Sequence, residues 1–136
     1  MRLLPFFLLL LATPAAADVS PFKMPSGNIE CYIAQGEAPP DLRCMIFDRS
    51  GPPAAPRPAS CQGPWGHIFI LLPGGRVQME CGSPGPANTA PGVGVAAYGQ
   101  TADWGGIMCQ SSTTGLECRN ADGHGFFLSR ARQSLF

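Results

Sequence analysis

The chain has 136 residues, and its nine Lys and Arg balance its nine Asp and Glu, so the formal net charge is zero. This balance argues against nucleic acid and anionic membrane surfaces as partners, because both are bound mainly through clustered positive charge. Only 13% of the residues are charged, whereas 17 are Gly and 15 are Pro, so we expect many short strands joined by tight turns.

The first residues have the pattern of an export signal. Arg2 precedes a short apolar run (residues 3–12), and three alanines precede Asp18. This order is typical of a cleaved secretory signal peptide, and the run is about half of the roughly 20 apolar residues that a membrane-spanning helix needs. We therefore predict a signal peptide over residues 1–17 and a single disulfide-stabilised β domain over residues 18–136. The protein would be secreted or periplasmic, with no membrane insertion after cleavage.

Six cysteines follow the predicted signal peptide. In an exported chain an even number of cysteines indicates a disulfide framework. Residues 29–33 and 42–46 each alternate so that their apolar residues share one side of a strand. An antiparallel pairing that sets Cys31 opposite Cys44 brings all of these apolar residues to the same side of the sheet. Strand register thus predicts a Cys31–Cys44 disulfide.

The remaining four cysteines are expected to form two further pairs. Cys109 and Cys118 flank a short polar stretch (residues 111–115) that ends in a glycine suited to a hairpin turn, which predicts a Cys109–Cys118 disulfide. Cys61 and Cys81 are then paired by elimination. All six cysteines are expected to be structural, since no C-x-x-C spacing suggests a metal site and no thiol is left for catalysis.

Eight segments have the apolar pattern of short strands, and none has a helical period of useful length. They are residues 29–33, 42–47, 67–72, 77–81, 93–98, 107–110, 116–120 and 126–129. The connections 51–64 and 82–92 are rich in Pro, Gly and Ala, and we expect mobile surface loops or crossovers between sheets there. These features predict an all-β fold, a small disulfide-stapled antiparallel β-sandwich or partly open barrel.

Asp122 and His124 lie in a Gly-containing segment (residues 120–125) and are the most conspicuous candidates for chemistry. As functional residues they would form an acid–base pair or bind a metal. The pattern Asn-x-Asp-Gly is also typical of a tight turn, and we favour this interpretation. The sequence predicts no catalytic residue, no metal site and no cofactor.

Aromatic and basic residues offer a second set of candidates. Trp65, Tyr98, Trp104 and residues 126–127 would form either an aromatic binding face or part of the core. Arg130 would either recognise an anion or simply improve solubility. The predicted binding surface therefore comprises Asp122, His124, Trp104 and Arg130.

Several motifs are shared with a known group of proteins. They are residues 25–31 (PSGNIEC), 105–109 (GGIMC), 115–120 (GLECRN) and 123–130 (GHGFFLSR). With these motifs the chain resembles an uncharacterised family of small secreted bacterial proteins. The resemblance implies bacterial export and six paired cysteines. It implies no activity and no functional residue, because the family has none assigned.

Together these features favour an exported, non-catalytic binding or structural module that meets a protein or glycan partner in the cell envelope. Two alternatives stay open. One is a small hydrolase or metal-dependent enzyme centred on Asp122 and His124. The other is a secreted inhibitor that presents disulfide-braced loops to a target enzyme.

Overall fold

The computed structural model describes residues 18–136, which form eleven strands in two sheets. The first sheet has the order β5-β4-β3-β2-β1-β6, and the second has the order β11-β10-β9-β8-β7. The strands are β1 (Asp18–Lys23), β2 (Ile29–Gln35), β3 (Asp41–Ile46), β4 (Ile68–Leu71), β5 (Gln78–Glu80), β6 (Gly94–Val95), β7 (Thr101–Asp103), β8 (Ile107–Ser112), β9 (Gly115–Asn120), β10 (Gly125–Leu128) and β11 (Gln133–Leu135).

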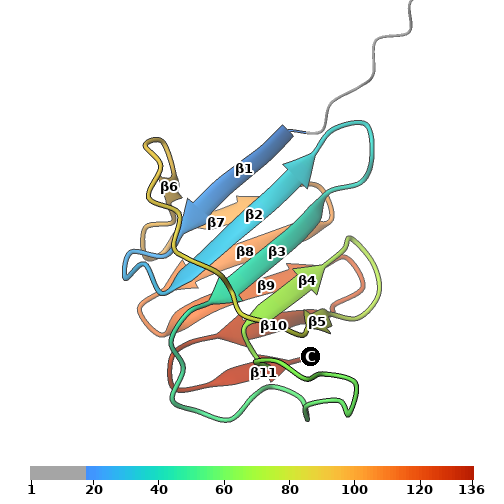
Figure 1. Ribbon diagram of the computed structural model, residues 1–136. Coiled ribbons are helices and arrows are strands. Elements are labelled where there is room, and N and C mark those ends of the chain that lie inside the picture. The colour runs from blue at the N-terminus through green and yellow to red at the C-terminus, as the bar shows by residue number, and fades with distance from the viewer. Residues whose placement is uncertain (1–17) are drawn as a thin grey trace, which may run out of the picture.

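The two sheets face each other as two layers (Figure 1). This is the predicted all-β sandwich, and the two sheets of the described residues do not join into a closed barrel. Residues 18–136 contain no helix long and apolar enough to cross a membrane. The predicted signal peptide, residues 1–17, lies outside the described residues.

The hydrophobic core lies between the sheets and takes alternate residues mainly from β2, β3, β4, β8, β9 and β10. In the β2–β3 pair the facing residues are Ile29 with Ile46, Cys31 with Cys44 and Ile33 with Leu42. This is the predicted register, and each of these side chains is at most 4% exposed. The β8–β9 pair sets Cys109 opposite Cys118 in the same way. Phe69 of the first sheet and Phe126 of the second meet between the layers, with ring centroids 5.6 Å apart.

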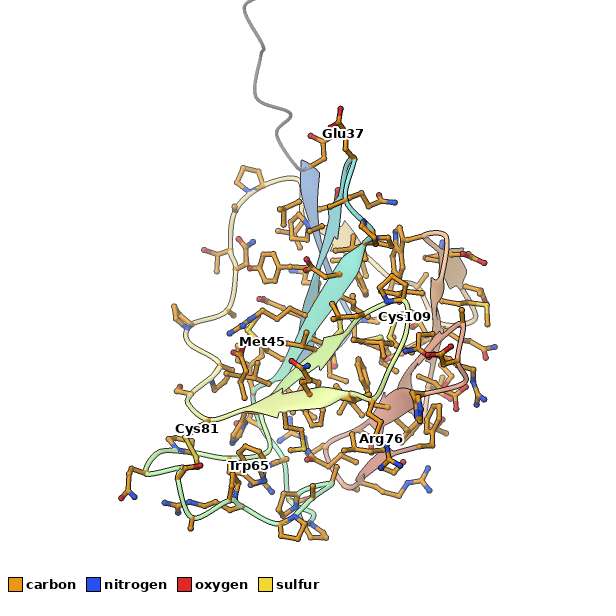
Figure 2. The ribbon with its side chains drawn as sticks, turned by 90° about the vertical axis from the view of Figure 1, so that its right-hand side faces the viewer. Glu37, Met45, Trp65, Arg76, Cys81 and Cys109 are labelled. Atoms are coloured by element: carbon orange, nitrogen blue, oxygen red, sulfur yellow. A yellow bond between two sulfur atoms is a disulfide. The ribbon has the colours of Figure 1, made fainter. Side chains whose placement is uncertain are left out.

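The structure contains the disulfides Cys31–Cys44, Cys61–Cys81 and Cys109–Cys118, the same three pairs that the sequence predicts. The first and third join directly opposed residues of neighbouring strands inside the core. The second joins the long loop after β3 to the end of β5, at the end of the molecule where Figure 2 shows Cys81 near Trp65.

Strand β1 was not predicted, because Pro21 interrupts its sequence and proline cannot donate to a β-ladder. Met24 N–H donates to the Ile29 carbonyl, so hydrogen-bonded positions towards β2 recur at every second residue, and residue 21 is not among them. Pro21 therefore removes no hydrogen bond to β2, and β1 forms despite the proline.

The predicted strand 93–98 is wrong beyond β6, which contains only Gly94–Val95. The chain turns immediately afterwards, at residues 97–100. Strands β7 and β11 also escape prediction. Each has three residues, which is too short for an alternating pattern to be recognised.

The connection over residues 82–93, here called the strap, crosses the outer face of the first sheet from the edge at β5 to the edge at β6 (Figure 1). It therefore joins opposite edges of one sheet and does not pass between sheets. Asn88 anchors it, because its N–H donates to Glu30 Oε1 (2.8 Å) and its Nδ2 to the Tyr32 hydroxyl (3.2 Å). Under the strap, Glu30 is 2% and Met45 is 8% exposed, although both point away from the core.

The loop between β3 and β4 is fixed by side chains as well as by the Cys61–Cys81 disulfide. Gln133 of β11 accepts a hydrogen bond from Ala54 N–H (2.8 Å) and donates to the Gly66 carbonyl (3.0 Å). Arg49 donates to the Trp65 carbonyl (2.7 Å). The loop thus has an ordered path without forming a helix or strand.

The exposure of the cysteines predicts the order in which the disulfides are reduced. Cys81 is exposed, whereas all four cysteines of the two core disulfides are at most 4% exposed. Since exchange requires access of a thiolate to a sulfur, mild dithiothreitol should reduce Cys61–Cys81 first. This disulfide joins residues that are 20 positions apart, and its loss should lower the free energy of unfolding by about 3 kcal/mol. Alkylation followed by mass spectrometry reports the order, and earlier reduction of Cys31–Cys44 would contradict it.

Glu30 should hold the strap more strongly than Tyr32 does. Glu30→Ala leaves the Asn88 N–H without its partner under the strap, which costs about 1–3 kcal/mol, whereas Tyr32→Phe removes a longer hydrogen bond worth about 1 kcal/mol. Native-state cleavage within residues 82–93 by proteinase K should accelerate tenfold or more in the first variant and less in the second. Equal cleavage rates in wild type and Glu30→Ala would show that other contacts hold the strap.

Candidate functional site

Asp122 and His124 lie in the turn that joins β9 to β10, and Asn120 organises this turn. The side chain of Asn120 is buried, and its Oδ1 accepts hydrogen bonds from the N–H groups of Asp122 (3.1 Å) and His124 (3.0 Å). Its Nδ2 donates to the carbonyls of Leu72 (3.0 Å) and Gly75 (2.7 Å). Asn120 therefore closes its own turn and ties it to the turn between β4 and β5.

The side chains of Asp122 and His124 have separate partners. Asp122 Oδ2 accepts a hydrogen bond from Gly75 N–H (2.8 Å), and His124 Nδ1 lies 3.4 Å from the Phe136 carbonyl oxygen. Within residues 18–136 no hydrogen bond joins the two side chains, and no three His, Cys, Asp or Glu residues are grouped as a metal site requires. These contacts are those of a structural turn.

The aromatic residues named from the sequence occupy different environments. Phe126 is fully buried, and Phe127 lies under Arg132, whose guanidinium is 4.5 Å from the ring centroid. Trp65 donates its indole N–H to the Ala55 carbonyl (2.9 Å) inside the β3–β4 loop. Phe126 therefore packs in the core, Phe127 lies on an outer sheet face, and Trp65 stabilises a loop.

Arg130 is exposed, and its guanidinium is 3.8 Å from the carboxylate of Asp48. With Tyr98 it lines a hollow of about 210 Å³. None of the three main hollows of residues 18–136 is lined by two of Asp122, His124, Trp104 and Arg130, and no hydrogen bond joins two of them. The predicted binding surface thus separates into independent places, and Trp104 lines a larger hollow than Arg130 does.

Strands β6 and β7 form the edges of the two sheets on the same side of the molecule (Figure 1). A cavity of about 400 Å³ opens between the two sheets on this side. Its size falls in the range of small-ligand pockets. Its apolar lining comes from both layers and includes Phe22, Ile33, Val95, Ala102, Trp104 and Leu116. The lining contains no Lys, Arg, Asp, Glu or His, so the cavity suits an uncharged group.

Two polar residues of the lining already have partners. Ser111 is 2% exposed, and its hydroxyl donates to the Ala96 carbonyl (2.8 Å). Gln100 Oε1 accepts a hydrogen bond from Ala97 N–H (2.9 Å). The first bond connects β8 to the β6–β7 segment, and the second lies within that segment.

Phe22 of β1 stacks on Trp104 across the gap between the sheets. The ring centroids are 5.6 Å apart and the ring planes differ by 24°. Both residues are partly buried, so the stack leaves aromatic surface exposed at the cavity. Partly exposed aromatic side chains at a concave site provide much of the binding free energy in many complexes.

A two-residue turn fixes the position of Trp104. Trp104 N–H donates to the Ile107 carbonyl (2.9 Å), and the two residues between them are Gly105 and Gly106, with φ angles of 74° and 111°. Positive φ at both central residues is the requirement of the tightest β-hairpins, and glycine meets it without strain. The Gly-Gly pair therefore places Trp104 at the end of β7.

A bulge begins β7 on the other side of the cavity. Residues 97–100 form a β-turn in which Gln100 N–H donates to the Ala97 carbonyl. Gly99 is the third residue of this turn, and its φ of 90° is a value that glycine adopts without strain. Gly99 N–H donates to the Ser111 carbonyl and Ser111 N–H to the Gln100 carbonyl, so two residues oppose one. The bulge returns the chain to pair with β8.

A family model matches almost the whole chain. The chain belongs to DUF6636, a family of unknown function. The family model matches residues 2–136. No curated protein and no solved structure matches the chain. Membership of DUF6636 assigns no activity and no functional residues, so the candidate site rests on geometry alone. The bacterial origin and export that the sequence implies stay predictions.

Sequence reasoning found part of the cavity of this DUF6636 member. It named Trp104 but missed Phe22, which lies on the unpredicted strand β1, and Val95, which is exposed on β6. The Gly105–Gly106 pair directly before the predicted strand at Ile107 was a usable signal, because a two-residue glycine turn implies a preceding strand.

Asn120 should matter far more for stability than Asp122 or His124. Asn120→Ala removes four hydrogen bonds and leaves polar groups unpaired, so it should lower the free energy of unfolding by about 3 kcal/mol or more. Asp122→Ala should cost about 1 kcal/mol or less, and His124→Ala less than that. Urea denaturation measures all three. A loss as large in His124→Ala as in Asn120→Ala would contradict the assignment of the turn to Asn120.

Proposed function

We propose that this protein is an exported, non-catalytic binding module that holds its ligand in the cavity between the sheets, against Trp104. One observation carries the proposal. A cavity of about 400 Å³ with an uncharged, mainly apolar lining opens at the edge of the sandwich, beside the buried core. A concave site of this size that leaves apolar and aromatic side chains in contact with solvent is typical of ligand-binding sites, because a ligand removes that surface from water.

The three disulfides support a site of action outside the cytoplasm. Intramolecular disulfides are typical of extracellular and periplasmic proteins, and they are rare where thioredoxin and glutathione keep thiols reduced. Together with the predicted signal peptide, they favour a periplasmic or secreted protein that meets a protein or glycan partner in the cell envelope.

The alternatives have less support in the described residues. An enzyme centred on Asp122 and His124 would need both side chains directed to a common substrate, and each is engaged elsewhere. An inhibitor would use the braced β3–β4 loop, whose residues 56–60 are exposed. The cavity favours binding between the sheets over both.

Binding in the cavity can be tested with an uncharged fluorescent probe, N-phenyl-1-naphthylamine. The protein has two tryptophans, so Trp65→Phe leaves Trp104 as the only indole, and the probe should quench its emission by energy transfer. Ala102→Leu in the same background adds three carbon atoms to the lining, narrows the cavity and should weaken probe binding at least tenfold. Phe22→Ala should also weaken binding, since it removes half of the aromatic stack.

Two controls separate cavity binding from loss of structure. Near-ultraviolet circular dichroism should show that Ala102→Leu keeps the wild-type fold. Tyr98→Ala alters an exposed aromatic residue outside this cavity and should leave the affinity for the probe unchanged. Equal affinity of the Ala102→Leu and parent proteins for the probe would overturn the proposed site.

A further inference from the structure

We propose that the natural occupant of the cavity is an extended polypeptide segment that pairs with the free edge of β7 and inserts one uncharged apolar side chain between the sheets. This inference rests on the proposed binding function and adds the chemical class of the ligand. Three observations lead to it: the unpaired edge, the direction of its side chains and the charge beside it.

The first observation is that β7 ends the second sheet and has unpaired backbone groups. The Ser111 N–H bond to the Gln100 carbonyl and the Trp104 N–H bond to the Ile107 carbonyl mark two hydrogen-bonded pairs with β8. Since such positions alternate in an antiparallel ladder, the backbone groups of Thr101 and Asp103 point away from β8. No group in residues 18–136 bonds to them, so this edge offers two N–H donors and two carbonyl acceptors.

The second observation is that this edge borders the cavity. Gln100, Ala102 and Trp104 face inward and line it, as their positions opposite Ser111, Cys109 and Ile107 require. A strand added to β7 would alternate in the same way, with the residue opposite Ala102 directed into the cavity towards Trp104. Strand pairing would thus deliver an apolar side chain to the uncharged lining.

The third observation is the charge on the outer side of β7. Asp103 is exposed, and it forms no ion pair with any described residue. One carboxylate oxygen, Oδ1, accepts a hydrogen bond from Gly105 N–H (2.9 Å). In an added strand the residue opposite Asp103 points to this outer side, next to the residue that enters the cavity. A Lys or Arg there would complement the carboxylate, so the favoured sequence is an apolar residue followed or preceded by a basic one.

Two other occupants would use the same place differently. A free apolar small molecule would fill the cavity without using the β7 edge. A second copy of the chain would pair β7 with β7 and produce a dimer. The unpaired N–H and carbonyl groups favour a peptide over the first. A β7–β7 pair would bring two exposed Asp103 carboxylates to the same outer face, and the repulsion between these like charges disfavours the second.

Display of random ten-residue peptides against the full chain provides the probe. Selected peptides should share an apolar residue beside Lys or Arg. A scan that methylates each backbone nitrogen of one selected peptide in turn should weaken binding at alternate residues only, because every second N–H faces β7. Loss at no position, or at consecutive positions, would overturn strand pairing, and so would a selection that yields no binder.

Substitutions at the edge provide a matched pair of variants. Thr101→Pro removes an N–H that makes no bond to β8 and should weaken the selected peptide at least tenfold. Thr101→Val keeps that N–H and should bind like wild type. Asp103→Asn should reduce the preference for a basic neighbour but keep the bond to Gly105 N–H. Equal peptide affinity in Thr101→Pro and Thr101→Val would overturn the proposal.

The naphthylamine probe distinguishes the failure of this inference from the failure of the proposed function. Probe binding is measured with the wild-type chain, because Thr101 also lines the cavity. Near-ultraviolet circular dichroism should show that Thr101→Pro is folded. If the probe binds the cavity but no peptide pairs with β7, the strand inference fails while the binding site stands. If the probe does not bind, the proposed function itself fails. Sedimentation showing a dimer that Thr101→Pro dissociates would replace the peptide by a second copy.

Discussion

The two-residue period of side chains along a strand is the constraint on which the structure depends. A shift of one residue between β2 and β3 would turn every core side chain of one strand to the opposite face. The Cys31–Cys44 disulfide joins directly opposed residues and so is compatible with one register only. Cys109–Cys118 does the same for β8 and β9. Each sheet thus has one fixed pair that determines which residues enter the shared core.

The outer faces of the two sheets differ, because the strap crosses only the first, and this difference contributes to the candidate site. The strap covers the first sheet and continues into β6, which pairs with β1 in parallel. Within residues 18–136 no comparable loop crosses the second sheet (Figure 1), where Arg119 and Arg132 lie over the rings of Phe136 and Phe127. Because the strap brings β6 to one edge and two glycine turns place β7 opposite it, the cavity lies between two short edge strands.

The residues that are most conspicuous in the sequence do not line the candidate site. His124 and Asp122 attract attention because they stand in a Gly-containing segment, yet their backbone N–H groups bond to Asn120, which connects two turns that are 45 or more residues apart in sequence. Trp104, by contrast, lies beside an open cavity with an aromatic partner on the other sheet. The two places differ in the residues that contact them, and these contacts come from parts of the chain that are distant in sequence.

Alternation and spacing in the sequence determined the β-sandwich, the register of β2 with β3 and all three disulfides, because these depend on residues that are close along the chain or on a count of cysteines. Strands β1 and β7, the strap and the cavity were decided by tertiary structure alone. β1 contains a proline that is harmless only at its particular position, and β7 is a strand only because β8 pairs with it. Phe22 and Trp104 are 82 positions apart, and no local pattern indicates that the packing of two sheets brings their rings together.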